Sequence, residues 1–152
     1  MIRNVNRIDH VAALIRPENL EAVADRMAEV FRTKFYGPFD RPAAGLRIAT
    51  SLDVGIELVS PLDDNPENPL NKMLAERGEH WMSVVVGVGD MDATCDHLAR
   101  LGYKARVRRQ GLTGEEPYAH RVTSMEQAMY DPDLSGGLPL AFCCIEEREG
   151  IE

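Results

Sequence analysis

The apolar positions of this chain follow strand-like and helix-like spacings in an order that occurs twice. Residues 7–16 form an apolar, β-branched run that Pro17 ends, which predicts a buried strand. In residues 18–31 the apolar positions recur every three or four residues, which predicts an amphipathic helix. Three short strand candidates follow, at residues 34–39, 46–51 and 55–60. The first half therefore reads βαβββ.

The second half repeats this order. Residues 80–88 read as a strand and residues 91–101 as a helix, with Asp90 as N-cap and Gly102 as the stop signal. Three further strand candidates lie at 103–109, 121–130 and 138–146. Between the halves, residues 61–78 start as a polar, proline-bearing stretch and end in a short helical pattern. The connector therefore separates two units of the same βαβββ order.

This duplication predicts an α+β fold. Two small βαβββ units cannot each bury both faces of a sheet alone, so side by side they should form one curved mixed sheet with outer helices and a central cavity. We expect residues 1–6 to be a frayed end. The predicted organisation is a single domain over 1–152, with a first module at 7–62, a connector at 63–79 and a second module at 80–147.

Composition narrows the class of protein. A hydrophobic fraction of 44% with 28% charged residues is typical of a soluble globular domain. The net charge of −8 argues against nucleic acid as a partner, and no apolar run reaches the roughly 18 residues that a membrane helix needs. The start of the chain lacks a signal-peptide pattern. Three cysteines, with Cys143 and Cys144 adjacent, are no disulfide framework, so we expect a cytoplasmic protein.

Two histidines occupy similar places in the two units. His10 and His80 each lie near the start of the first predicted strand of their unit, and Glu57 lies within the apolar run 55–59. Two imidazoles and a carboxylate form a plausible site for a divalent metal ion. The alternative to a metal site is purely structural. The two histidines would then be hydrogen-bonded to the backbone, and Glu57 would be paired with a buried arginine. The repetition, together with the cost of burying an unpaired charge, favours the metal.

The motifs around these residues resemble a known superfamily. The segments Ile8-Asp9-His10-Val11-Ala12 and Gly55-Ile56-Glu57-Leu58-Val59, and the stretch from Asn68 to His80, are similar in order and spacing to the vicinal oxygen chelate superfamily. That superfamily includes glyoxalase I, methylmalonyl-CoA epimerase, extradiol dioxygenases and bleomycin-resistance proteins. In its connector and second half, the chain most resembles methylmalonyl-CoA epimerase. The resemblance implies a glyoxalase-like fold and a homodimer.

The resemblance also implies one divalent metal ion, bound by one side chain from each of four strands. His10, Glu57 and His80 match the first three ligands, and the ion could be Co, Mn, Ni, Zn or Fe. The fourth ligand of the family is usually a Glu in the last strand, which also transfers protons. Ala141 stands at that place here. Cys143, through a register shift, and Glu146 are the possible substitutes.

A metal ion at this site would polarise a carbonyl and stabilise an enolate, while a carboxylate or histidine removes the α-proton. The candidate catalytic residues are Glu57, His120 and Glu126. Arg106 and Arg108 share one strand face by the period of two and are candidates for binding a carboxylate or the phosphates of CoA. A solvated strand edge is the alternative for these two arginines.

Three functions fit these residues. The leading hypothesis is a metal-dependent isomerase or lyase, epimerase- or glyoxalase-like, which acts beside the carbonyl of a small-molecule or acyl-CoA-type substrate. The second is a non-heme Fe(II) dioxygenase, which also uses two histidines and a carboxylate but takes its carboxylate from the last strand in this superfamily. The third is a metal-free binding protein of the resistance type, which would have no need for His10, Glu57 and His80.

Overall fold

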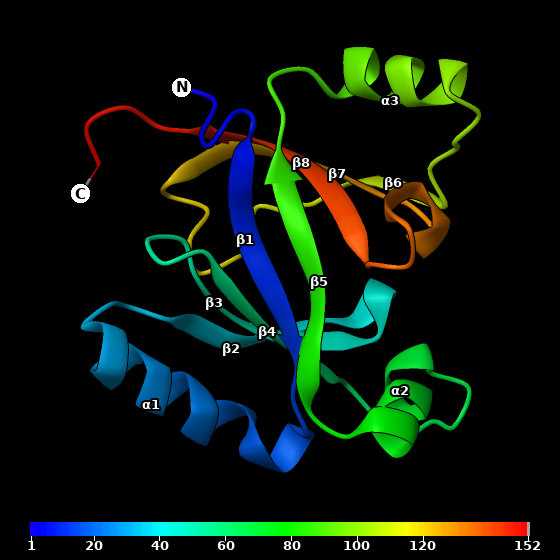
Figure 1. Ribbon diagram of the computed structural model, residues 1–152. Helices are drawn as coiled ribbons and strands as arrows, with labels where there is room; N and C mark the ends of the chain where they lie inside the picture. The colour runs from blue at the N-terminus through cyan, green and yellow to red at the C-terminus, as the bar shows by residue number, and fades with distance from the viewer. Residues whose placement is uncertain (152) are drawn as a thin grey trace. The chain divides into compact units, whose positions relative to one another are not determined.

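The computed structural model describes residues 1–151, which form two compact units (Figure 1). We call residues 10–82 the N-terminal unit, and residues 1–9 with 83–151 the C-terminal unit. Each unit contains a mixed sheet of its own strands and the helices that pack on it. The α+β class predicted from the sequence is confirmed.

The N-terminal unit has a four-stranded sheet in the order β2-β3-β4-β1. Strands β1 and β4 are parallel, whereas β2–β3 and β3–β4 are antiparallel. Its elements are β1 (Arg7–Leu14, of which residues 10–14 belong to this unit), the 3-10 turn η1 (Pro17–Asn19), α1 (Leu20–Phe31), β2 (Tyr36–Arg41), η2 (Pro42–Ala44), β3 (Leu46–Ser51), β4 (Ile56–Pro61) and α2 (Pro69–Arg77).

The C-terminal unit repeats this arrangement in the order β5-β8-β7-β6, with β5 parallel to β8. Its elements are β5 (His80–Gly87, which begins in the N-terminal unit), α3 (Met91–Arg100), β6 (Val107–Gln110), β7 (Val122–Met129), η3 (Pro132–Ser135) and β8 (Leu140–Glu147). The side chain of Asp90 accepts a hydrogen bond from the backbone N–H of Ala93 at 2.9 Å, as the predicted N-cap should.

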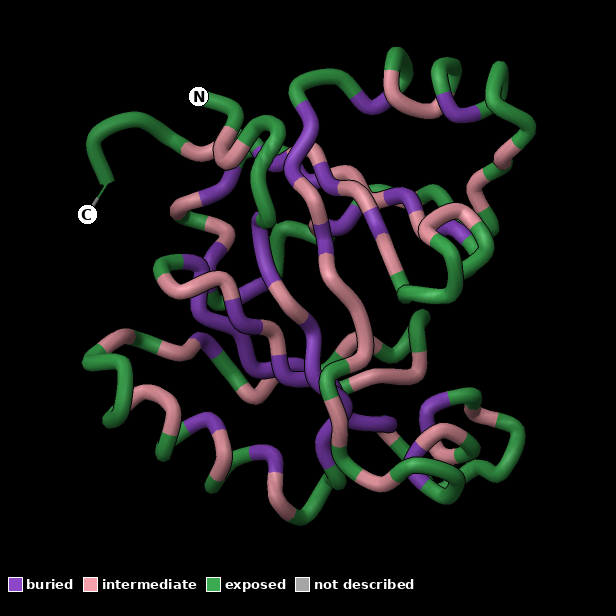
Figure 2. The backbone as a smooth tube through the Cα atoms, viewed as in Figure 1, coloured by how far each residue is buried: buried purple, intermediate pink, exposed green. Residues whose placement is uncertain are grey.

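Helices cover both faces of the N-terminal sheet. On one face, Leu20 and Ala24 of α1 pack with almost fully buried residues of β1, β3 and β4 and with the residue that directly follows β1: Ala13, Ala49, Ile56, Leu58 and Ile15. On the other face, Leu70 and Leu74 of α2 pack against Leu14 and Val59. Each fully buried leucine contributes about 1.5–3 kcal/mol. Figure 2 shows these buried stretches along β1 and β4.

In the C-terminal unit, α3 covers one face of the sheet. Met91 and Leu98 pack with Ala128, Tyr130 and Phe142, and the rings of Tyr130 and Phe142 meet edge to face at 5.7 Å between centroids. Alternate residues of β7 and β8 therefore point away from α3.

Two local predictions were wrong. Strand β6 begins at Val107 rather than at 103, because Tyr103 and Ala105 pack against the core beneath α3. Residues 1–6 are not frayed: the N–H of Arg3 donates to the carbonyl of Ile145 at 2.9 Å, and Val5 bridges to Gly87. Both differences arise from contacts distant in sequence.

Candidate functional site

His10 and Glu57 lie on one face of the N-terminal sheet. Ala12 of β1 is in register with Glu57 of β4, and paired residues point to the same face. His10 precedes Ala12 by two residues, so its side chain shares that face, one diagonal step from Glu57. Since α1 packs on the opposite face, the two candidate ligands lie on the side away from α1. His10 is buried and Glu57 is half-buried.

Glu57 lies next to the apolar region that α2 covers. Val59, two residues along β4, packs with Leu70 and Leu74 of α2. Thr50 lies opposite Glu57 on β3 and donates its hydroxyl to the carbonyl of Ile56 at 3.2 Å. Within residues 1–151 no arginine or lysine forms an ion pair with Glu57. The buried-arginine alternative for this carboxylate therefore has no support among the described residues.

His80 is held in one tautomer. Its Nδ1 lies 2.8 Å from the carbonyl oxygen of Gly78, and because a carbonyl only accepts hydrogen bonds, Nδ1 carries the proton. Nε2 then has a free lone pair, and this atom is buried with no hydrogen-bond partner in the described part of the chain. Buried polar atoms without a partner are rare. Histidines that bind metal through one ring nitrogen typically donate a hydrogen bond from the other ring nitrogen to a backbone carbonyl or a carboxylate.

The structure does not gather the three candidate ligands into one cluster. Among residues 1–151, the ligand atoms of His10, Glu57 and His80 do not all lie within 4.8 Å of one another. Their convergence on one ion stays a prediction.

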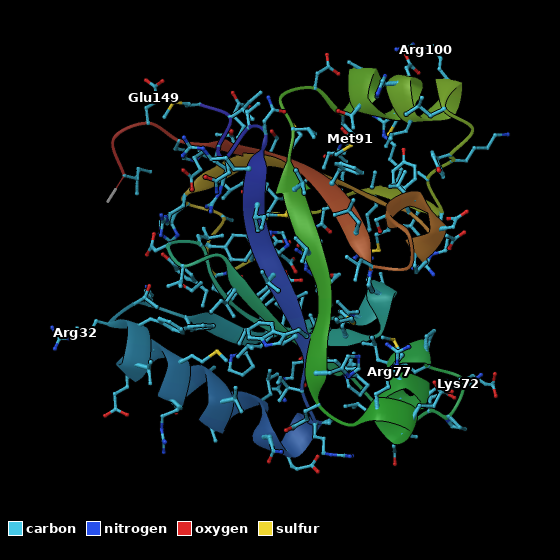
Figure 3. The ribbon with its side chains drawn as sticks, in the orientation of Figure 1. Arg32, Lys72, Arg77, Met91, Arg100 and Glu149 are labelled. Carbon is cyan, nitrogen blue, oxygen red and sulfur yellow. The ribbon has the colours of Figure 1, made fainter. Side chains whose placement is uncertain are left out.

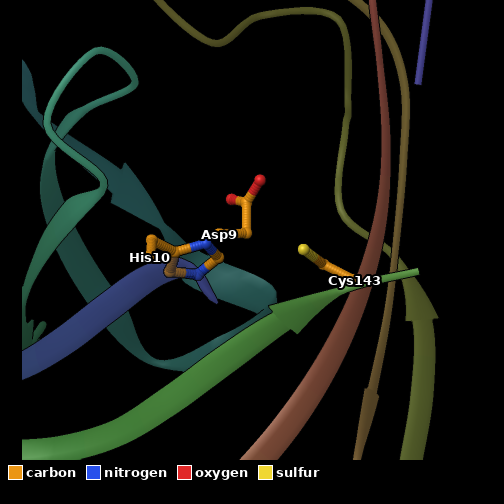
Figure 4. A group of neighbouring side chains, drawn as sticks. All are labelled: Asp9, His10 and Cys143. Atoms are coloured by element: carbon orange, nitrogen blue, oxygen red, sulfur yellow. The ribbon is translucent and has the colours of Figure 1, made fainter. Parts of the chain in front are cut away.

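Asp9 and Cys143 are two buried side chains that lie close together in the C-terminal unit, and of these the sequence predicted a role only for Cys143. Asp9 Oδ2 accepts hydrogen bonds from Arg3 Nε at 2.8 Å and Asn4 Nδ2 at 3.1 Å. Cys143 Sγ lies within 4.8 Å of a carboxylate oxygen of Asp9. Figure 4 draws these two side chains together with His10, the next residue after Asp9 in the chain. Burial, and then the charge of Asp9, raise the pKa of the Cys143 thiol well above its ordinary value. The thiol therefore stays protonated.

Cys143 and Glu146, the two predicted substitutes for the missing glutamate, both lie in β8. Ala141 pairs with Val85 and Cys143 with Gly87, so Ala141 and Cys143 point to the same face of the sheet. That face lies away from α3, because Phe142 packs beneath the helix. Cys143 thus shares the face of Ala141 without any register shift. Glu146 is exposed.

The other predicted site residues in the C-terminal unit are engaged elsewhere or exposed. Glu126 accepts a hydrogen bond from Arg108 Nε at 2.6 Å, and Arg108 NH2 also lies 2.5 Å from Asp92 of α3. These carboxylates hold the pKa of the Arg108 guanidinium above its ordinary value. Arg106 NH1 lies 3.8 Å from Asp131 Oδ1. His120 is exposed in the turn before β7.

A groove in the N-terminal unit contains none of the predicted site residues. It lies between the end of β4 and α2, and its walls combine Pro17, Leu62 and Leu74 with the acidic residues Asp63 and Asp64.

None of the described helices has the length and apolar character that crossing a membrane requires.

Comparisons with known proteins show what this fold is similar to. No protein-family model and no curated protein matches the sequence. The structure is similar to methylmalonyl-CoA epimerase from Mycobacterium tuberculosis, with a TM-score of 0.71 and 20% identity over 95% of this chain and 90% of that one. A hypothetical protein from Bacillus halodurans C-125 gives a TM-score of 0.72 and 23% identity, over 96% of this chain and 97% of that one.

Methylmalonyl-CoA epimerase from Streptomyces coelicolor, solved in complex with 2-nitronate-propionyl-CoA, gives a TM-score of 0.71 and 18% identity, over 91% of this chain and 96% of that one. At these identities the similarity shows the fold alone. The chain has the fold of the methylmalonyl-CoA epimerases, and the glyoxalase-like fold predicted from its motifs is confirmed.

Proposed function

We propose that the protein is a metal-dependent isomerase or lyase that acts at the carbon beside a carbonyl, with an acyl-CoA thioester as its class of substrate. The observation that carries the proposal is the buried, unpartnered Nε2 of His80, whose ring is fixed through Nδ1 by the carbonyl of Gly78. The fold shared with enzymes that epimerise an acyl-CoA supports the choice of reaction.

His10, Glu57 and His80 are the residues that would hold the metal. A donor set of two imidazoles and one carboxylate suits zinc, cobalt, nickel, manganese or iron. A divalent ion there would polarise the substrate carbonyl and so acidify the neighbouring C–H bond. The homodimer implied by the resemblance remains a prediction.

The residues of the chain prepare this chemistry. The hydrogen bond from His80 Nδ1 to the carbonyl of Gly78 fixes the orientation of the ring and leaves the lone pair of Nε2 for the metal ion. Val59, two residues from Glu57 and on the same face of β4, packs with Leu70 and Leu74 of α2, so Glu57 has an apolar neighbour on its own face. Thr50 donates its hydroxyl to a backbone carbonyl and so leaves the Glu57 carboxylate available. We assign proton transfer to Glu57, because Glu126 is already bonded to Arg108.

Exchange of the α-proton tests the proposal. The protein, loaded in turn with cobalt, manganese, nickel, zinc and iron, is incubated with methylmalonyl-CoA in D2O, and deuterium incorporation is followed by mass spectrometry. We expect metal-dependent exchange that falls by a factor of about 10²–10⁴ in Glu57→Gln, the usual contribution of a general base. Glu67→Gln, a change at an exposed carboxylate, is the matched control. Exchange at the uncatalysed rate with all five metals would contradict the proposal.

His120 keeps its predicted role as an alternative proton carrier. His120→Gln measured in the same assay decides between the two residues: a larger loss than in Glu57→Gln would move the proton transfer to His120. Oxygen uptake by the iron-loaded protein with catechols, without proton exchange, would favour the dioxygenase.

A further inference from the structure

One face of the C-terminal sheet carries a polar row that the predicted site did not include. Arg109 of β6 pairs with Gln127 of β7, and Gln127 pairs with Cys143 of β8. Because residues paired across strands point to the same face, these three side chains lie in one row. The row crosses β6, β7 and β8, which are neighbours in the sheet (Figure 1). Arg109 and Gln127 are both half-buried.

Apolar side chains flank this row on both sides. The neighbouring row on one side consists of Val107, Met129 and Ala141. On the other side, Met125 pairs with Ile145. A few polar groups set within apolar surface are typical of small-molecule binding sites.

The arginines of β6 face opposite sides of the sheet. Arg108 pairs with Ala128, which packs under α3, and its guanidinium is bonded to Asp92 and Glu126. Arg109 points away from α3, and among residues 1–151 its guanidinium has no hydrogen-bond or ion-pair partner. The Gln127 side chain also has none in the described chain.

We propose that Arg109, together with the amide of Gln127, binds a carboxylate of a small-molecule ligand whose adjoining part packs on the flanking apolar rows. A guanidinium presents two parallel N–H donors that match the two oxygens of a carboxylate, and the bonds are strengthened by charge. Arg109 and Gln127 then provide a carboxylate-binding site within the C-terminal unit itself. The choice of malonate as the probe rests on the proposed function. The affinity of this row for a carboxylate is measured without any catalytic assay.

The test is a titration of the full-length protein with malonate, followed by two-dimensional ¹H–¹⁵N NMR. Malonamide, which has the same shape without the charge, and inorganic phosphate are titrated in parallel. The variants are Arg109→Gln, Arg106→Gln and Arg100→Gln. Arg100 lies at the exposed end of α3 and points away from the sheet (Figure 3), so its variant controls for the loss of one positive charge.

We expect malonate to shift the backbone amides of Arg109 and Gln127, and Arg109→Gln to raise its Kd by a factor of roughly ten or more, as the loss of a charge-assisted pair should. Malonamide should bind the wild type as weakly as malonate binds Arg109→Gln. Arg100→Gln should keep the wild-type Kd within a factor of about two, since a single distant charge is largely screened. Unchanged unfolding midpoints would show that the fold is intact.

Several results would overturn the proposal. These are an unchanged Kd in Arg109→Gln, an equal or larger loss in Arg106→Gln, no binding of malonate to the wild type, and tighter binding of phosphate than of malonate. The variant His80→Ala distinguishes a failure of the Arg109 proposal from a failure of the proposed metal site. Malonate binding that is lost in His80→Ala but kept in Arg109→Gln would place the anion at the metal, which supports the metal site and contradicts the role of Arg109.

Discussion

Arg3 contacts two carboxylates that differ in burial, and this difference predicts how much each contact contributes to stability. Its Nε lies 2.8 Å from Asp9, whose side chain is 3% exposed, and its NH1 lies 2.7 Å from Glu147, whose side chain is 30% exposed. Arg3→Met keeps the apolar stem and removes the charge. The Asp9 carboxylate would then stay buried without this cation, which costs about 3–5 kcal/mol. A domain of this kind has a total stability of about 5–15 kcal/mol.

Two variants of the partners act as controls. Glu147→Gln removes only the more exposed contact and should cost less than about 1 kcal/mol. Asp9→Asn removes the buried charge itself, while Arg3 keeps Glu147, so its cost should lie between the other two.

Urea unfolding at pH 7, followed by circular dichroism, measures the three costs. With an m-value of about 1–3 kcal/mol/M, Arg3→Met should lower the midpoint by about 1 M or more. A cost below about 1 kcal/mol for Arg3→Met, or equal costs for Arg3→Met and Glu147→Gln, would refute the reasoning from burial.

Two further predictions concern single contacts. Hydrogen bonds from Asn19 Nδ2 and then from the backbone N–H of Arg16 lower the pKa of Glu79 below its ordinary 4.5, so its contribution to stability is present above that value and is lost as the pH falls through the lower folded pKa. Glu79→Gln should therefore flatten the pH dependence of the unfolding free energy between pH ~5 and ~3, and an unchanged slope would contradict this. A Cβ at Gly87 would lie 2.3 Å from the carbonyl oxygen of Asn4, so Gly87→Ala should destabilise by about 1–3 kcal/mol in urea unfolding. Gly89→Ala, whose Cβ would meet only the two methyl groups of Val5, at 3.5 and 3.8 Å, should cost clearly less.

The sequence predicts the order of the elements because apolar spacing is a local signal. The short strand-like run at residues 46–51 and the helical spacing in residues 18–31 can both be read from the local sequence, and the structure has β3 and α1 there. The start of β6 and the pairing of residues 1–6 depend on partners elsewhere in the chain. The hydrogen bond from Arg3 to Ile145, for example, has no local signature.

The candidate site shows the same limit. The period of two predicts that Arg106 and Arg108 share one strand face, but β6 begins only at Val107, and the sequence does not reveal which face of this strand α3 covers. That depends on the pairing of β6 with β7, which turns Arg108 toward Asp92 and leaves Arg109 on the other side. Similarly, the spacing of His80 relative to His10 suggested a ligand, whereas its tautomer follows from the turn that brings the carbonyl of Gly78 to Nδ1.

The most direct test of the account is the metal content of the protein purified without added metal or chelator. Elemental analysis compares the wild type with Glu57→Ala and His80→Ala, and with Glu67→Ala as the control at an exposed carboxylate. We predict close to one divalent ion per chain in the wild type and in Glu67→Ala, and a large loss in the other two variants. A wild type that holds no metal even after incubation with excess ion, or variants that keep it, would contradict the proposed site.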